Sequence, residues 1–192
     1  NYDAARLIFP TGAPYCPSVF RTGIHMAVQK LPEKMLGEWI WSSSENDKDN
    51  LFRFFRREVR VEGIGVSAEL WICAHSSYHL LINGRQIGYG PPPQSRERSY
   101  AECYDISFYL ETGLNAIAVI VHATGLPQYS RHVKRPGLWC QVNMDNQPFV
   151  WTDAKWLSDD GDCFMENMPR RSFGNGFTEN LDFNSYPHGW TM

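Results

Sequence analysis

The sequence lacks the features that mark a membrane-spanning, exported or nucleic-acid-binding chain. No apolar run is long enough to cross a bilayer, and the first residues show no basic stretch followed by an apolar one. The net charge of -3 gives no electrostatic reason to expect nucleic acid. We therefore expect neither a membrane nor a nucleic acid among its partners. Because the chain begins with Asn1 rather than Met, we expect a processed or truncated piece, and a removed signal segment is left open.

Cysteine is scarce and follows no pattern. The five cysteines are odd in number, widely spaced and without a Cys-x-x-Cys pair: Cys16, Cys73, Cys103, Cys140 and Cys163. Such spacing is typical neither of a disulfide framework nor of a zinc ribbon. A reducing compartment such as the cytoplasm is favoured, while a secreted or periplasmic location stays open.

Motifs for catalysis, phosphate binding and metal binding are also missing. There is no Gly-x-Ser-x-Gly nucleophile elbow, and the glycines at 84, 88 and 90 are wrongly spaced for a phosphate loop. His75 and His79 lie close in sequence, but a metal site needs three or four converging ligands, so hydrogen-bonded or solvent-facing histidines are favoured. The segment 159–162 is rich in Asp and predicts an exposed turn, whose spacing matches no standard calcium loop. We expect no cofactor, and no motif supports a structural calcium ion.

What the sequence does contain is a series of short segments with a two-residue apolar period. In one of them Ala68, Leu70 and Ile72 share a face, and Asn83-Gly84 is typical of a two-residue hairpin turn. Strands are predicted at 51–61, 67–74, 78–82, 86–88, 115–122, 138–144 and 148–151. At least seven short strands separated by turn signals predict an all-β chain, an antiparallel jelly-roll β-sandwich.

Outside these strands the pattern predicts an arm and one helical turn. Residues 1–38 have weak periodicity and four prolines, and they are interpreted as an N-terminal arm, with a strand at 23–29, packed on a sandwich of residues 39–192. We expect Ser107 to cap a helical turn at 108–110 and Gly113 to take a left-handed conformation at its exit.

Aromatic residues are abundant, with seven Trp, nine Tyr and eleven Phe. Trp39, Trp41 and Trp156 are expected between the sheets or at the ends of the sandwich. Trp71 points away from the apolar face of its strand, toward solvent, a ligand, the arm or another domain. Packing is favoured over sugar stacking there, because large aromatic side chains are usually buried.

A set of short motifs in a fixed order resembles a known module. The central series is Ala68-x-Leu70, Tyr78-x-Leu80-x-Ile82-Asn83-Gly84, Gly88, Gly90-Pro91, Tyr104-Asp105-Ile106-Ser107, Leu110 and Gly113-x-Asn115-x-Ile117-Ala118-Val119. Trp39-Ile40-Trp41 precedes this series. It is followed by Pro136-Gly137-Leu138, by Thr152-Asp153-x-x-Trp156, and by Gly176-Phe177-x-Glu179, Asp182 and Gly189-Trp190. Together they resemble the galactose-binding-like N-terminal β-sandwich of bacterial α-L-rhamnosidases. The resemblance covers residues 39 to 190.

The resemblance implies a piece of a glycoside hydrolase that lacks the enzyme's acid and base. In that family the catalytic residues belong to an α/α barrel of several hundred residues that follows the module, so this barrel is the implied partner. One departure is Asn184, which stands where the family's motif leads us to expect an Arg. The implied role is a non-catalytic accessory module that docks on the catalytic domain and shapes substrate access. A free-standing carbohydrate-binding module and a protein-binding sandwich unrelated to glycans remain alternatives.

Hydrolysis by the chain alone would need two carboxylates about 5–10 Å apart across a cleft. The carboxylate-rich places are Glu102 with Asp105, Asp159 with Asp160 and Asp162, Glu166, and Glu179 with Asp182. Asp105 is interpreted as a backbone cap before the helical turn. Since none of these pairs has a positioned partner, a self-contained active site is disfavoured.

Two loops and a C-terminal pair supply the candidate contact residues. Pro91, Pro92 and Pro93 fix an extended segment that cannot continue the sheet and that leads to Arg96 and Arg98. A second loop, 124–136, carries Tyr129, Arg131 and His132 among its polar residues. The candidates for contact with a domain or a sugar are therefore Trp71, Arg96, Arg98, Tyr129, Arg131, His132, Glu179 and Asp182. Domain contact is favoured over sugar contact, and a merely solvated edge is the remaining alternative.

Overall fold

The computed structural model describes residues 32–41, 48–63, 67–94, 99–129, 131–165 and 167–192. Its strands are β1 (Leu51–Val61), β2 (Ala68–His75), β3 (Ser77–Ile82), β4 (Arg85–Gly90), β5 (Glu102–Asp105), β6 (Gly113–Ala123), β7 (Gly137–Met144), β8 (Gln147–Trp151), β9 (Leu157–Asp160), β10 (Arg170–Ser172) and β11 (Gly176–Phe177), with a 3-10 turn, η1 (Ser107–Tyr109), between β5 and β6. No helix among the described residues is long and apolar enough to cross a membrane.

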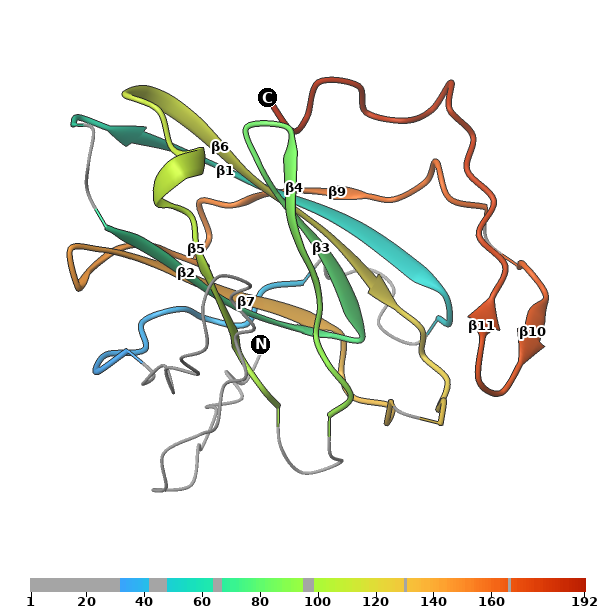
Figure 1. Cartoon of the computed structure of the whole chain (residues 1–192). Helices are drawn as coiled ribbons and strands as arrows, with labels where there is room; N and C mark the ends of the chain where they lie inside the picture. The colour runs from blue at the N-terminus through green and yellow to red at the C-terminus, as the bar shows by residue number, and fades with distance from the viewer. Residues whose placement is uncertain (1–31, 42–47, 64–66, 95–98, 130, 166) are drawn as a thin grey trace, which may run out of the picture.

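The strands form two facing antiparallel sheets, which confirms the predicted β-sandwich (Figure 1). One sheet has the order β4-β3-β6-β1-β9, and the other has the order β5-β2-β7-β8. The hairpin β10-β11 stands apart at one side of the sandwich. Each element predicted by the two-residue period is present, with β1 at the predicted residues 51–61.

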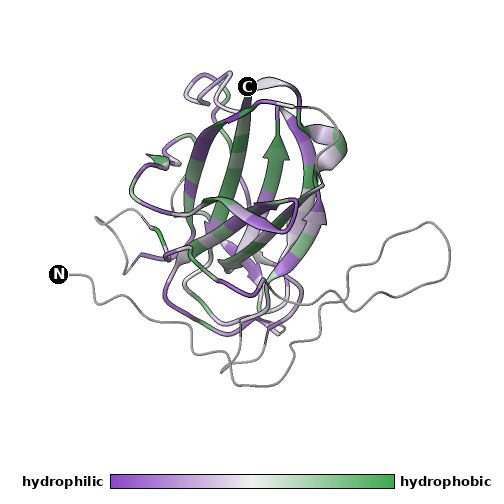
Figure 2. Ribbon diagram, turned by 90° about the vertical axis from the view of Figure 1, so that its left-hand side faces the viewer, coloured by the Kyte–Doolittle hydropathy of each residue, from purple (hydrophilic) through white to green (hydrophobic). Residues whose placement is uncertain are grey.

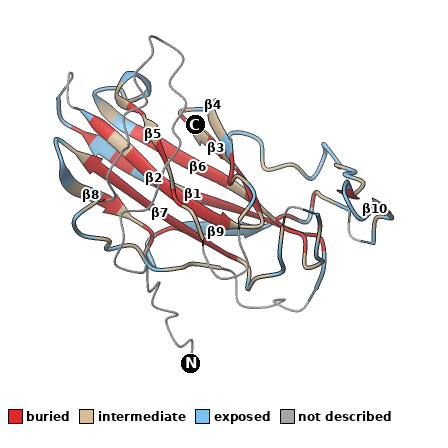
Figure 3. Cartoon of the chain, turned by 60° about the horizontal axis from the view of Figure 1, so that its bottom comes forward, coloured by how far each residue is buried: buried red, intermediate tan, exposed pale blue. Residues whose placement is uncertain are grey.

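The core lies between the two sheets and is built by the predicted alternating residues. Its buried members include residues of β2 (Ala68, Leu70, Ile72, Ala74), β3 (Tyr78, Leu80, Ile82), β6 (Ile117, Val119, Val121) and β7 (Leu138, Cys140, Val142), together with Trp156. Burying apolar surface contributes about 25 cal/mol per Å², so these alternating side chains dominate the stability of the fold. Figure 2 shows the apolar residues gathered along the strands, and Figure 3 shows the buried strands with exposed loops around them.

Asparagine residues fix the turns at one end of the sandwich. Asn83 and Gly84 both have positive φ, 49° and 76°, as the type I′ hairpin turn requires. The side chain of Asn83 donates to Asn115 Oδ1 at 2.8 Å and accepts from the backbone N–H of Ala116 at 2.8 Å. Asn115 is buried and donates to the carbonyls of residues 111 and 113. The two side chains therefore tie the β3–β4 turn to the start of β6.

The outer face of the four-stranded sheet carries a second apolar cluster. It contains Trp71, Cys73, Ala101, Cys103 and Trp139, with Met35 and Trp39 packed against it. The segment before β1 is hydrogen-bonded there: Gln141 binds the backbone of residues 34 and 36, and Trp139 Nε1 donates to the carbonyl of Gly37 at 2.9 Å. The boundary of the arm at residue 38 stays a prediction, and the strand expected at 23–29 lies outside the described residues.

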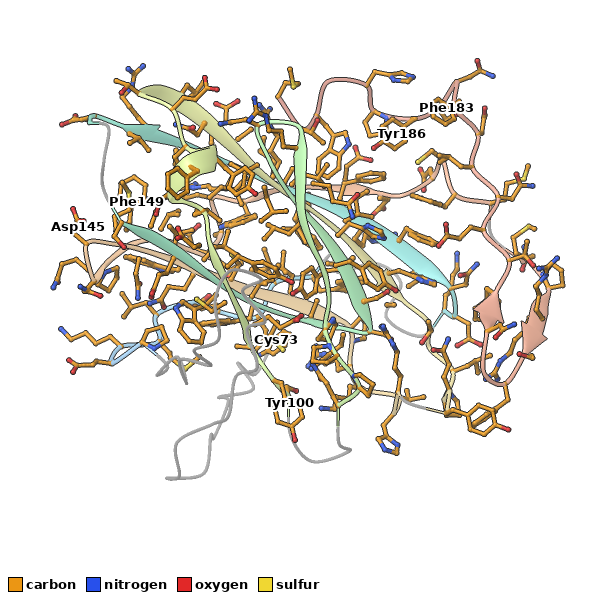
Figure 4. The ribbon with its side chains drawn as sticks, in the orientation of Figure 1. Cys73, Tyr100, Asp145, Phe149, Phe183 and Tyr186 are labelled. Atoms are coloured by element: carbon orange, nitrogen blue, oxygen red, sulfur yellow. The ribbon has the colours of Figure 1, made fainter. Side chains whose placement is uncertain are left out.

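The C-terminal segment covers part of the outer face of the five-stranded sheet. Phe52 stacks on Phe164 with ring centroids 3.8 Å apart, and Phe54 meets Trp190 edge to face at 4.8 Å. The end of the segment reaches the β3–β4 turn, where the Met192 side chain lies beside Gly84, and Arg56 of β1 donates to the carbonyl of Met192 at 2.5 Å. Two rings of this segment, the exposed Phe183 and the half-buried Tyr186, stack with centroids 5.9 Å apart (Figure 4).

Three local expectations need correction. Of the exposed turn expected at 159–162, residues 159 and 160 belong instead to the edge strand β9, in which Asp160 pairs with Arg53, and the chain turns at 162–163. Ser107 does not cap η1 from outside; it is the first residue of the turn, and its Oγ accepts from the N–H of Ala68. Trp39 lies on the outer face of the four-stranded sheet rather than between the sheets. Asp105 does accept from the N–H of residue 107, at 3.0 Å, as predicted.

Candidate functional site

The two candidate loops meet at one edge of the sandwich and form a small cleft. Its floor is Ala74, His75 and Ser76, where β2 passes into β3, and its walls come from residues 91–94 and 131–134. The lining residues are Ala74, His75, Ser76, Pro91, Pro92, Gln94, Arg131, His132 and Lys134. The cleft is shallow and partly open to solvent, and its cavity volume of about 20 Å³ leaves room for roughly one water molecule. We call this feature the loop cleft.

His75 holds the floor of the loop cleft to three other segments. Its Nδ1 lies 2.8 Å from the carbonyl oxygen of Arg135, which can only accept, so Nδ1 carries the proton. Its Nε2 therefore accepts from the hydroxyl of Ser99, at 2.9 Å. The ring also stacks on Trp39 at 4.5 Å. These contacts confirm the interpretation of His75 as a hydrogen-bonded histidine.

Burial keeps the His75 ring neutral within this series of hydrogen bonds. Desolvation, with a further contribution from the nearby Lys134 charge, lowers the pKa of His75 to about 4 against the opposing effect of its bond to the Arg135 carbonyl. Lys134 Nζ donates to Ser99 Oγ at 3.0 Å, and burial lowers the pKa of Lys134. The direction of donation thus runs from Lys134 through Ser99 and His75 to the carbonyl of Arg135.

Arg131 and His132, two of the candidate contact residues, lie in the wall of the loop cleft. Arg131 Nη1 donates to the carbonyl of Ser76 at 2.5 Å, which joins the second loop to the floor. The positive charge of Arg131 also helps to lower the pKa of His122, which burial lowers to about 4. His132 is exposed.

Tyr129 lies next to the loop cleft in sequence but contacts the hairpin β10-β11 instead. Its side chain is 84% exposed and meets Phe173, itself 47% exposed, edge to face at 4.9 Å. The guanidinium of Arg170 lies 5.1 Å from the ring centre of Phe173, and it also donates to the carbonyl of Pro127. The exposed rings of Tyr129 and Phe173 and the half-buried Arg170 form a group that we call the aromatic tip.

The other candidates do not join either feature. Trp71 is completely buried in the cluster on the outer face of the four-stranded sheet, so it does not reach the surface. Arg96 and Arg98 lie outside the described residues. Glu179 is close enough to His79 to oppose the burial-driven lowering of the pKa of that histidine. Asp182 closes its own turn: it accepts from the N–H of Asn184 and the hydroxyl of Ser185, and the first of these bonds is the main cause of its lowered pKa.

Most of the carboxylates considered above for catalysis form hydrogen bonds or ion pairs within the fold instead. Tyr78 donates to Glu102 at 2.5 Å and lies 3.0 Å from the hydroxyl of Tyr104, where the edges of the two sheets approach. Burial raises the pKa of Glu102, and the bond from Tyr78 opposes this shift. Asp105 binds residue 107, and Asp160 binds Arg53 at 2.9 Å. Among the described residues, no three His, Cys, Asp or Glu side chains converge as metal ligands.

Sequence reasoning missed several residues of the site. It gave no role to Ser99, because a single serine after an Arg-rich stretch carries no periodic signal. It also missed Arg170 and Phe173, although an aromatic residue followed by Gly174 in a short hairpin is a usable turn signal.

Figure 4 places Tyr100 near the start of β5 and Cys73 on β2, on the side of the sandwich where the proline loop leaves the sheet. Cys73 is a buried free thiol whose pKa burial raises to about 12.

The two-layer antiparallel fold, with its long loops gathered at one edge, is consistent with the galactose-binding-like β-sandwiches. The chain belongs to the α-L-rhamnosidase N-terminal domain family, whose family model matches residues 65–192. Among curated proteins no relative is detected.

Solved structures place the chain beside one small part of large enzymes. The GH78 family rhamnosidase of Bacillus sp. GL1 is 30% identical, with a TM-score of 0.77 over 81% of this chain and 17% of that enzyme. The α-L-rhamnosidase of Aspergillus terreus is 25% identical, with a TM-score of 0.62 over 78% of this chain and 18% of that enzyme. The enzyme from Dictyoglumus thermophilum shares the fold at 23% identity, with a TM-score of 0.57 over 73% of this chain and 16% of that one. The chain therefore spans less than a fifth of each enzyme.

Proposed function

We propose that the chain is a non-catalytic accessory module of an α-L-rhamnosidase-like glycoside hydrolase, and that it docks on the catalytic domain of that enzyme. The observation that carries the proposal is the family match over residues 65–192 together with the small share, 17%, of the Bacillus enzyme that the chain covers. The structural use of Glu102, Asp105 and Asp160 supports a non-catalytic role, because a hydrolytic pair needs carboxylates that face a substrate.

The aromatic tip is the surface we assign to docking. Tyr129 and Phe173 present exposed ring surface beside the Arg170 guanidinium, and these residue types are enriched at protein interfaces. The tip is held rigidly, since Arg170 ties the loop at Pro127 to the hairpin. A rigid aromatic surface loses little conformational entropy on binding, which favours a permanent neighbour in the same polypeptide.

Hydrogen exchange tests the docking proposal. The reading frame that encodes the chain is sequenced on both sides, and its complete product is expressed beside the chain of residues 1–192. We expect a catalytic domain in the complete product, and we expect amides at 128–129 and 172–174 to exchange more slowly there than in the isolated chain. Tyr129→Ala is expected to restore faster exchange at 172–174 in the complete product.

Phe108→Ala is the matched control, because Phe108 is 89% exposed on η1, away from the hairpin. This variant should leave exchange at the aromatic tip unchanged. A reading frame without a catalytic domain would contradict the proposal and favour a free-standing carbohydrate-binding module or a protein-binding sandwich. Equal exchange at the tip in both proteins would overturn this docking surface.

A further inference from the structure

The sequence contains two Asn-Gly pairs, at residues 83–84 and 175–176. In such a pair the backbone nitrogen of the glycine can attack the side-chain amide carbon of the asparagine, because glycine has no side chain to obstruct the approach. The reaction requires the asparagine side chain to turn onto that nitrogen. The two pairs therefore differ in reactivity according to how firmly the fold holds each asparagine side chain.

The side chain of Asn83 is held by the fold at both of its polar atoms. Its Nδ2 donates to the carbonyl of Tyr109 at 3.0 Å and to Asn115 Oδ1 at 2.8 Å. Its Oδ1 accepts from the N–H of Ala116 at 2.8 Å. The pair lies in the turn between β3 and β4, two strands of the five-stranded sheet. These bonds must break before the amide carbon of Asn83 can meet the nitrogen of Gly84, so the folded sheet protects this pair.

Asn175 is in the opposite situation, in the hairpin β10-β11 that stands apart from both sheets (Figure 1). The residue is exposed, and its backbone N–H donates to Ser172 Oγ at 3.0 Å. Its side chain forms no hydrogen bond with any of the described residues. Gly176 follows with a φ of 70°, a conformation that favours glycine, so the hairpin itself keeps an unobstructed nitrogen next to this amide.

From this contrast we propose that Asn175 is a site of spontaneous covalent modification, deamidation through a succinimide, and that Asn83 is protected from it. The nitrogen of Gly176 forms a bond to Cγ of Asn175, the bond from Cγ to Nδ2 breaks, and ammonia leaves with the proton that the Gly176 nitrogen has lost. Water then opens the five-membered ring at either carbonyl carbon, which leaves an aspartate or an isoaspartate at position 175. The product adds a carboxylate to the hairpin that carries Arg170 and Phe173. This chemistry belongs to the isolated chain and does not depend on docking.

The test is peptide mapping by mass spectrometry after incubation at pH 8 in ¹⁸O-labelled water, which marks the oxygen gained during the incubation. In the folded chain of residues 1–192 we expect product at position 175 to form more than about tenfold faster than at position 83, because three hydrogen bonds protect the second site. In urea the two positions should react at similar rates. Asn180, exposed but followed by Leu181, is the internal control and should stay unmodified. Equal rates at 83 and 175 in the folded chain overturn the proposal, as does reaction at 175 in urea only.

A variant checks the assignment to Asn175 independently. Each deamidation adds one negative charge, so ion-exchange chromatography of the incubated parent chain is expected to show an accumulating acidic species. Asn175→Gln moves the amide carbon one methylene further from the Gly176 nitrogen, which disfavours ring closure, and this variant should lose the acidic species. Asn180→Gln, the matched control in the same segment, should keep it. An acidic species that accumulates equally in the Asn175→Gln chain overturns the assignment, as does its loss in Asn180→Gln.

Discussion

The imidazole of His75 stacks on the indole of Trp39, with ring centroids 4.5 Å apart and an angle of 25° between the planes. The contact joins the segment before β1 to the floor of the loop cleft. Both ring nitrogens of His75 are also hydrogen-bonded, so protonation of the ring would reverse the direction of the bond between Nε2 and the Ser99 hydroxyl. A protonated ring would turn Nε2 into a donor facing the Ser99 hydroxyl, which already accepts from Lys134.

Acid is therefore expected to destabilise the fold through its buried histidines. Burial lowers the pKa values of His75 and His122 from 6.5 to about 4, so the unfolded chain binds more protons below pH 6.5. Each histidine contributes stability that is present above pH 6.5 and is lost progressively as the pH falls toward 4, up to about 3 kcal/mol. Glu102 acts in the opposite direction, because its raised pKa favours the folded state at acidic pH. Urea unfolding at pH 7 and pH 4.5 measures the net effect.

Single variants test whether His75 causes part of that pH dependence of the unfolding free energy. His75→Gln should reduce the loss of unfolding free energy between pH 7 and pH 4.5, whereas His188→Gln, at an exposed position of the C-terminal segment, should not. The same pH dependence in the His75→Gln chain would contradict the assignment.

Gly90→Ala is expected to destabilise the fold by about 3 kcal/mol. A Cβ atom at this position would overlap the carboxylate of Glu102 and come within 2.8 Å of the hydroxyl oxygen of Tyr78. The buried hydrogen bond between those side chains would have to break or shift. Gly63→Ala is the control, since its Cβ would meet nothing within 4 Å, and its unfolding free energy should stay within about 0.5 kcal/mol of the parent chain. Equal effects of the two variants in urea unfolding would refute this account.

Asp160→Ala is expected to lower the unfolding free energy by about 2 kcal/mol. Arg53 is buried, and Asp160 at the edge of the sheet lies 2.9 Å from its Nε. Removing the carboxylate weakens the compensation of a buried charge, although the exposure of Asp160 limits the loss. Asp159→Ala, one residue earlier and exposed, should change the unfolding free energy by less than about 0.5 kcal/mol. A loss of similar size for both variants in urea unfolding would show that the edge strand, rather than the ion pair, is responsible.

The strands and tight turns could be predicted because their signals are local. Leu70, Leu80 and Val119 alternate with other residues along their strands, and the turn at Asn83-Gly84 needs two positive φ angles that this pair readily adopts. Strand β9 could not be predicted in this way. Its four residues are all exposed and show no apolar period, and pairing with β1 holds them in the sheet.

The site was predicted only in part, because it depends on distant contacts. The stiff proline loop and the basic loop were each identified from their composition. That they face one another across His75 follows from the pairing of β2 with β7 and of β3 with β4, which local patterns do not specify. Trp71 shows a second limit of local patterns. Its position in the strand correctly predicted that its side chain points away from the core between the sheets. The alternation did not reveal the further layer of residues that buries this side chain.

The most direct measurement of the central claim is the hydrolysis of 4-nitrophenyl α-L-rhamnopyranoside by the chain of residues 1–192 and by the complete product of its reading frame, compared at equal concentration. We predict release of nitrophenol by the complete product and none above background by the chain alone. Rhamnoside hydrolysis by the isolated, purified chain would contradict a non-catalytic accessory role.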